Sequence, residues 1–118
     1  MNFTVITNNP MVYNKIEGAV CEASLIDVLL AVRDRVHLGH TLLTHPLAGS
    51  VKPGQTPYRS VVVSAGRGEQ TDFESLALIE DALRVSRALT TAAGQRELSE
   101  KVLSDFQLID YSLIAEIL

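Results

Sequence analysis

Apolar and polar side chains recur along this chain at two different spacings, which predict both strands and helices. Residues 3–7 (FTVIT) are β-branched or aromatic and end at two asparagines and a proline, which is typical of a strand that enters a turn. Residues 40–44 (HTLLT) and 60–65 (SVVVSA) predict two more strands, and the three valines indicate a strand covered on both faces. Residues 17–22 form a weaker candidate, because Gly18 interrupts them.

Three segments have the spacing of three and four that gathers apolar side chains on one face of a helix. The first segment begins at Ser24, a good helix cap, and Gly39 offers its stop. The second segment follows Thr71 and Glu74, which have the spacing of a capping box. The third segment spans about residues 96–117, and its apolar stripe needs a surface to cover it. That stripe consists of Leu98, Val102, Phe106, Ile109, Leu113 and Ile117.

Strands and helices thus mix along the chain, which predicts an α/β fold. We expect a single domain over residues 1–118, with three helices packed on a small mixed or mostly parallel sheet of about four strands. A chain of 118 residues is the size of one ordinary domain. The strand order stays open, because the fourth strand can follow the third as a long hairpin or cross the sheet edge to a parallel position.

Composition and charge exclude several classes of partner. The chain is 47% hydrophobic with a net charge of −4, so it has no general attraction for nucleic acid or anionic lipid. No apolar run reaches the roughly 20 residues that span a bilayer, and the N-terminus lacks the features of a signal peptide. Cys21 is the only cysteine, which leaves no disulfide framework and no cysteine cluster for a metal. We expect a cytoplasmic protein that has no membrane or nucleic-acid partner, no metal and no cofactor.

The segment 45–58 is the most unusual part of the sequence. It holds three prolines and two glycines, too many helix breakers for a crossover helix. A loop of this length is uncommon in a compact domain and is often a lid or a binding loop. If strands 3–7 and 40–44 are parallel neighbours, the segments after them leave the sheet at the same edge, where α/β proteins place their ligands. A polar site is therefore predicted at that edge.

The predicted site combines amides, hydroxyls, an imidazole and two cations. Asn8 and Asn9 can donate and accept hydrogen bonds, and His45 can bind an anion when protonated or transfer a proton. Arg59 can hold a carboxylate or phosphate with two parallel hydrogen bonds. The predicted ligand-binding residues are Asn8, Asn9, Thr44, His45, Ser50, Lys52 and Arg59. A small anionic ligand matches this set, although asparagines before a proline also have a purely structural explanation as a turn.

No catalytic signature accompanies these residues. The Gly66-Arg67-Gly68 turn lacks the third glycine of a dinucleotide fingerprint, and Ala48-Gly49-Ser50 lacks the ending of a phosphate-binding P-loop. Ser50 and His45 could form a nucleophile and a base, but the loop holds no acidic residue to orient the histidine. We therefore expect a binding protein. The alternative is a small enzyme that acts on an anionic metabolite with His45 as general acid or base.

Two motifs in this chain resemble the GrdX family of small proteins, which are encoded beside the components of glycine, sarcosine and betaine reductase in amino-acid-fermenting anaerobes. The motifs are TNNP at residues 7–10 and HTLLTHPLAGSVKPGQTPYRS at residues 40–60, and the resemblance extends over residues 7–88. It brings no catalytic residues with it. The resemblance implies only a context, glycine or betaine reductase-type amino-acid fermentation. Within that context, the cluster of polar residues without a catalytic set leads us to expect a non-catalytic accessory protein that binds a small anionic ligand or a reductase component.

The last two helices of the sequence carry broad apolar faces. Apolar residues are dense at the end of the chain, where residues 114–118 read IAEIL. A large apolar surface near a terminus is usually buried by the sheet or by a partner. The sequence therefore also allows a homodimer through these two helices.

Overall fold

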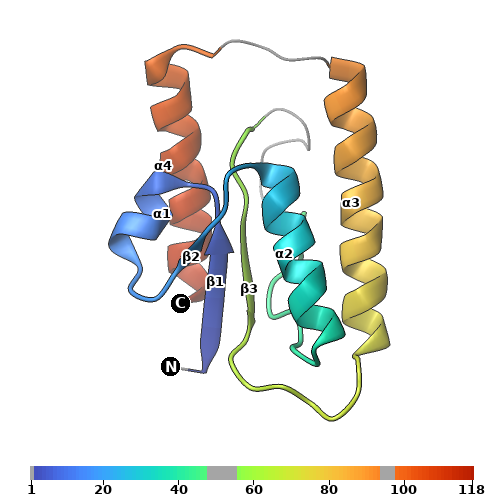
Figure 1. Ribbon diagram of the computed structural model, residues 1–118. Helices are drawn as coiled ribbons and strands as arrows, with labels where there is room; N and C mark the ends of the chain where they lie inside the picture. Colours follow the sequence, from blue (N-terminus) through green and yellow to red (C-terminus); the bar gives the residue numbers. More distant parts are fainter. Residues whose placement is uncertain (1, 48–55, 94–97) are drawn as a thin grey trace.

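The computed structural model describes residues 2–47, 56–93 and 98–118, with the backbone alone for residues 90–93. Helices and strands mix along these residues, so the predicted α/β class is confirmed (Figure 1). The elements in chain order are β1 (Phe3–Thr7), α1 (Pro10–Lys15), β2 (Val20–Cys21), α2 (Leu25–His37), β3 (Ser60–Ser64), α3 (Phe73–Ala93) and α4 (Glu100–Ile117).

The sheet is mixed, as predicted, and has three strands in the order β2-β1-β3. β1 runs parallel to β2 and antiparallel to β3. The predicted strand at residues 40–44 is reduced to an isolated antiparallel bridge between Leu42 and Val63. Val63 pairs with Thr4 of β1 on its other side, so β3 lies between β1 and this segment. The expectation that β1 and residues 40–44 are parallel neighbours is therefore wrong.

Side-chain hydroxyls explain why residues 40–44 form no regular strand. Serine and threonine side chains compete for backbone hydrogen bonds, and here they replace backbone partners of a regular ladder. The bonds are Thr41 N–H to Ser64 Oγ at 2.9 Å, Leu42 N–H to Ser75 Oγ at 3.0 Å and Val62 N–H to Thr44 Oγ1 at 3.0 Å. The segment follows the open side of β3 without becoming a full member of the sheet.

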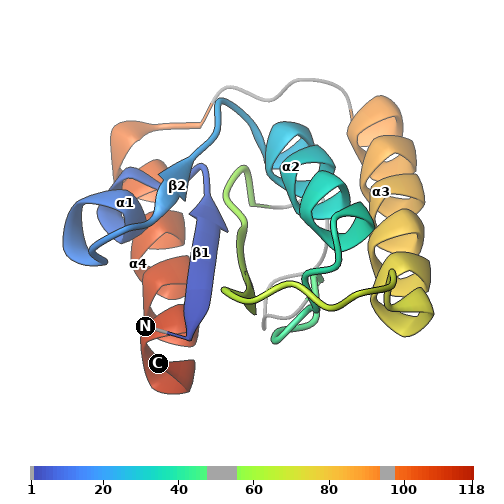
Figure 2. The ribbon, with the colours of Figure 1, turned by 60° about the horizontal axis from the view of Figure 1, so that its bottom comes forward.

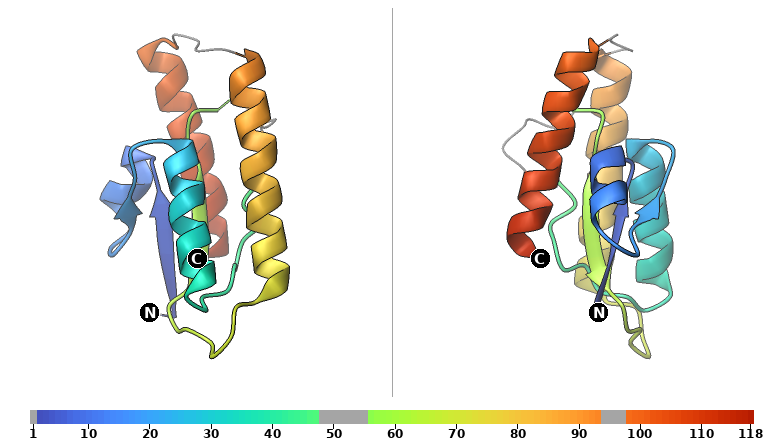
Figure 3. Two further views of the ribbon diagram at one scale, coloured as in Figure 1. Left: turned by 45° about the vertical axis from the view of Figure 1, so that its right-hand side comes forward. Right: turned by 90° about the vertical axis from the view of Figure 1, so that its left-hand side faces the viewer.

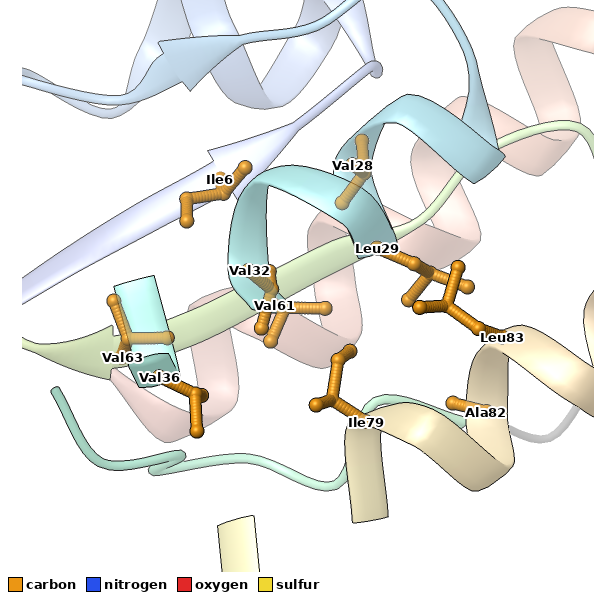
Figure 4. Packing of buried hydrophobic residues seen from close by; sticks show 10 residues of the cluster. All are labelled: Ile6, Val28, Leu29, Val32, Val36, Val61, Val63, Ile79, Ala82 and Leu83. Atoms are coloured by element: carbon orange, nitrogen blue, oxygen red, sulfur yellow. The ribbon is translucent and has the colours of Figure 1, made fainter. Parts of the chain in front are cut away.

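Helices cover both faces of the sheet (Figures 2 and 3). α2 and α3 pack on one face, whereas α1 and α4 pack on the other. Val61 and Val63 of β3 point into the first core, and Val62 points into the second, which confirms that this strand is covered on both faces. The first core consists of Ile6, Val28, Leu29, Val32, Val36, Val61, Val63, Ile79, Ala82 and Leu83 (Figure 4). The second consists of Val5, Val12, Val62 and Ile114.

Side chains cap the starts of the helices, and the sequence predicted one of the two caps described here correctly. Ser24 caps α2 as predicted, because its Oγ accepts the Asp27 N–H at 3.1 Å. At the start of α3 the accepting side chain is Asp72 rather than Thr71, since the Ser75 N–H donates to Asp72 Oδ2 at 3.2 Å. Within the described ranges, no helix is long and apolar enough to cross a membrane.

The stripe predicted for the last helix is not the face that α4 turns toward the sheet. Tyr111 and Ile114 of α4 contact the second core instead. Val102, Ile109 and Ile117 of the stripe stay 37%, 38% and 55% exposed. The sheet therefore does not bury the apolar surface that the sequence indicated for this helix.

Candidate functional site

The carboxyl end of β1 is fastened to the end of the long loop by a single asparagine. The Asn8 side chain donates from Nδ2 to the Pro57 carbonyl at 2.7 Å and accepts the Arg59 N–H on Oδ1 at 2.8 Å. The Asn8 N–H also donates to the Arg59 carbonyl at 3.4 Å. The segment after the first strand and the end of the loop are thus neighbours, although residues 40–44 do not pair with β1.

Asn9 joins the same end of β1 to two helices. Its Oδ1 accepts the Met11 N–H at 3.0 Å and so caps α1, whose first residue is Pro10. Its Nδ2 donates to the Gln107 carbonyl at 2.9 Å and to Asp110 Oδ2 at 3.0 Å, both on α4. Asn9 is completely buried, and both ends of its amide are used inside the fold.

A chain of hydrogen bonds runs from Asn9 through two hydroxyls to a carboxylate. The Ser60 hydroxyl donates to Asp110 Oδ2 at 2.6 Å, so it can only accept from the Thr7 hydroxyl, which lies 2.7 Å away. Thr7 Oγ1 in turn accepts the Asn9 N–H at 2.9 Å. The Asp110 oxygen therefore receives two donors and closes a ring of bonds between β1, β3 and α4. We call Thr7, Asn8, Asn9, Arg59, Ser60 and Asp110 the β1-end cluster.

Arg59 adds a buried positive charge to this cluster, with only 5% of the residue exposed. Burial lowers the pKa of the guanidinium, and the nearby carboxylate of Asp110 raises it in part. Arginine stays charged in proteins even so. The cluster consequently holds one cation and one carboxylate that attract each other.

Ser60 of the β1-end cluster serves as a hydrogen-bond donor between elements of the fold. Ser60 is 7% exposed, and its hydroxyl donates to a carboxylate. In the described ranges, no imidazole makes a hydrogen bond to this hydroxyl. A serine nucleophile is activated by a neighbouring base, most often an imidazole, that takes its proton. Groups of three or more metal-ligating side chains are likewise missing from the part of the chain that the structure describes. The arrangement orients and joins segments of the fold.

The remaining predicted site residues lie elsewhere or cannot be placed. Thr44 is on the far side of β3 from β1, where its Oγ1 accepts the Val62 N–H. His45 is exposed, and its Nδ1 accepts the Leu47 N–H at 3.0 Å, which leaves the proton of the neutral ring on Nε2. Ser50 and Lys52 fall outside the described residues.

The structure thus brings together Asn8, Asn9 and Arg59 of the predicted set and adds residues that the sequence did not indicate. Thr7 and Ser60 face each other because β1 and β3 pair in that register. Asp110 comes from the final helix, where no local sequence signal distinguishes it from the other acidic residues. The sequence did contain a signal for α1, since an asparagine followed by a proline is a good start for a helix.

Comparison with known proteins places the whole chain in one family. The model of the family described as GrdX-like protein matches residues 4–118. This match includes α4, which lies beyond the range over which the two motifs indicated a resemblance. Neither the curated proteins nor the solved structures contain a match to this chain. The chain belongs to the GrdX-like protein family.

Proposed function

We propose that this protein is a non-catalytic accessory protein that binds a protein component of a glycine, sarcosine or betaine reductase system. Membership in the GrdX-like family supports the association with such a system. The observation that carries the proposal is the ring of hydrogen bonds around Asp110. Because Ser60, Thr7 and Asn9 all donate or accept within this ring, their polar groups serve the fold rather than a reaction.

A protein partner fits the β1-end cluster better than a free anion does. A small anion that approached Arg59 would be repelled by the Asp110 carboxylate, which already compensates the guanidinium. The Asn8 and Asn9 amides are also engaged inside the fold. A protein surface does not need to enter the cluster, because it can contact the exposed groups around it.

Both described ends of segment 45–58 are held to the fold, each at its own place. Leu47 packs against the first core, and Pro57 and Arg59 are fastened to Asn8. His45 is exposed at the first of these ends, and its Nδ1 accepts the Leu47 N–H. A preorganised surface loses less conformational entropy when it binds, and exposed polar residues on it contribute to recognition.

His45→Ala is expected to weaken binding of the reductase component about tenfold, because it removes the exposed imidazole from the contact. Binding of each purified reductase component to the surface-immobilised protein measures this affinity. His37→Ala is the matched control, since His37 is also exposed but lies at the end of α2. We expect the control to bind as the wild type does.

Calorimetry with glycine, betaine, phosphate and acetyl phosphate separates this proposal from its alternatives. Binding of one of these metabolites, lost in His45→Ala and accompanied by no capture of any reductase component, would replace the protein partner with a small anionic ligand. Turnover of a metabolite with a bell-shaped pH dependence that His45→Ala abolishes would instead establish an enzyme.

A further inference from the structure

Helix α4 buries little apolar surface for its length. Of its 18 residues, all of which the structure describes, Ile114 alone is buried, and Tyr111 is partly buried against the same core. α2 has 13 residues and buries four of them. The first core contains no residue of α4, which lies on the opposite side of the sheet from α2 and α3 (Figure 3, right). Apolar burial therefore holds α4 much less firmly than it holds α2.

Hydrogen bonds of two residues supply a second part of the attachment of α4. Gln107 donates from Nε2 to the Tyr58 hydroxyl at 2.8 Å, and its carbonyl accepts Asn9 Nδ2 at 2.9 Å. Asp110 Oδ2 accepts from Ser60 at 2.6 Å and from Asn9 at 3.0 Å. The contacts of α4 with the sheet are thus polar to a large extent.

Water can replace these polar contacts when the whole helix moves away from the sheet. The Ser60 hydroxyl, the Asn9 amide and the Asp110 carboxylate then become hydrated together, so each bond contributes only a small net free energy to docking. Substitution of Asp110 in the docked helix is different, because it leaves the donors buried without an acceptor. The apolar side chains of the first core find no replacement for their contacts in water.

The other elements of the fold keep their main contacts without α4. β1 and β3 pair with each other over the whole of Phe3–Thr7. Asn9 Oδ1 caps α1 through the Met11 N–H, and the Asn8 side chain holds the backbone of Arg59. None of these bonds uses an atom of α4. The sheet, α1 and the first core can consequently persist when α4 has left.

We propose that α4 is a releasable helix, which leaves the sheet as a unit while the other elements stay folded. Release uncovers Val62 of β3, which packs with Ile114 and is 2% exposed in the docked state. It also uncovers the Ser60 hydroxyl and the Asn9 amide. The protein thereby has a closed and an open state that present different surfaces at the end of β1. This inference does not depend on the partner proposed above, because it concerns this chain alone.

Amide hydrogen exchange of the full chain, followed by NMR where exchange reports the opening equilibrium, tests the release. A single helix of this length is only marginally stable in water, so its amides exchange once it leaves the sheet. We expect the amides of residues 106–113, in the middle of α4, to be protected about a hundredfold less than those in the middle of α2. Equal protection of the two helices would overturn the proposal.

Two conservative variants separate release of α4 from unfolding of the whole chain. Ile79→Val weakens the first core, so we expect α2 amides to exchange about fivefold faster while α4 amides keep their wild-type rates. Ile114→Val is the matched variant on α4, since both isoleucines are buried. It is expected to accelerate exchange in α4 and α2 alike, because the open and the unfolded chain both lack the Ile114 contact. If Ile79→Val accelerates α4 as much as α2, α4 opens only when the whole chain unfolds, and the proposal is overturned.

Discussion

The Asp110→Ala variant is expected to lose about 2 to 3 kcal/mol of its free energy of unfolding, because buried donors and a buried cation lose their carboxylate. Ser60 Oγ donates to Asp110 at 2.6 Å and Asn9 Nδ2 at 3.0 Å, so both donors lose an acceptor. Arg59 loses the charge that offsets its burial. Urea denaturation measures the effect as a lower midpoint with an unchanged slope.

Two further variants separate the charge of Asp110 from its position on the helix. Asp105→Ala removes an exposed carboxylate of the same helix and changes helix propensity as much as Asp110→Ala does. We expect its free energy of unfolding to change by at most about 0.5 kcal/mol. Asp110→Asn keeps an acceptor oxygen but loses the charge, and an intermediate loss of about 1 kcal/mol is expected. Equal losses for Asp105→Ala and Asp110→Ala would contradict a structural role for the β1-end cluster.

The hydrogen-bond requirements of the β1-end cluster also explain the orientation of α4. Ser60 and Asn9 are buried at the end of the sheet and need acceptors there, since an unsatisfied buried polar group costs about 1 to 3 kcal/mol. The face of α4 with Gln107 and Asp110 supplies these acceptors, and Tyr111 and Ile114 supply apolar contact beside them. Docking through the apolar stripe predicted from the sequence would leave those donors without partners.

Much of the fold could be predicted because local signals agree with tertiary structure in its main elements. The apolar spacing from Leu25 to Val36 and the cap at Ser24 define α2, and these valines and leucines do enter the first core. Three consecutive valines in β3 indicated burial on both faces, which the two cores confirm. In such segments the residues that favour the element also supply its buried face.

Short or interrupted elements could not be predicted in this way. α1 has six residues, too few for a helical period to emerge, and β2 has two. Residues 40–44 have strand-like composition, but hydroxyls of Ser64, Ser75 and Thr44 take hydrogen bonds that a strand would use. Those competing partners lie far away in the sequence, except for Thr44, so no local pattern reveals them.

Only the part of the candidate site that comes from β1 and the loop could be predicted from the sequence. Asn8, Asn9 and Arg59 gather because a strand end and a loop end meet, and turn-forming residues mark both in the sequence. Asp110 could not be identified, because its role depends on which face of α4 packs on the sheet. The apolar stripe suggested that another face of α4 packs on the sheet. The spacing of apolar residues shows which face of a helix is apolar, but it contains no information on buried hydrogen-bond donors.

Gly39→Ala is expected to destabilise the protein by about 3 kcal/mol, through backbone strain and the loss of a close contact. Gly39 follows α2 with φ at +106°, a conformation that residues with a Cβ atom rarely adopt. A Cβ atom there would lie 2.5 Å from the Gly68 carbonyl oxygen and 3.2 Å from the Gly68 nitrogen. The added methyl group must therefore push apart two backbone segments that are joined by the Gly68 N–H to Gly39 carbonyl bond at 2.8 Å.

Variants at two other glycines separate backbone strain from the steric contact. Gly18 also has a positive φ, +80°, but a Cβ atom there meets nothing within 4 Å, so Gly18→Ala measures strain alone and is expected to cost about 1 to 2 kcal/mol. Gly66 has open space and no positive φ, so Gly66→Ala should be neutral or stabilise by about 0.5 kcal/mol. The steric contribution is the difference between Gly39→Ala and Gly18→Ala in urea denaturation. Equal losses in the free energy of unfolding for these two variants would mean that the turn at Gly68 moves aside at no energetic cost. The close contact between the end of α2 and this turn would then contribute nothing to stability.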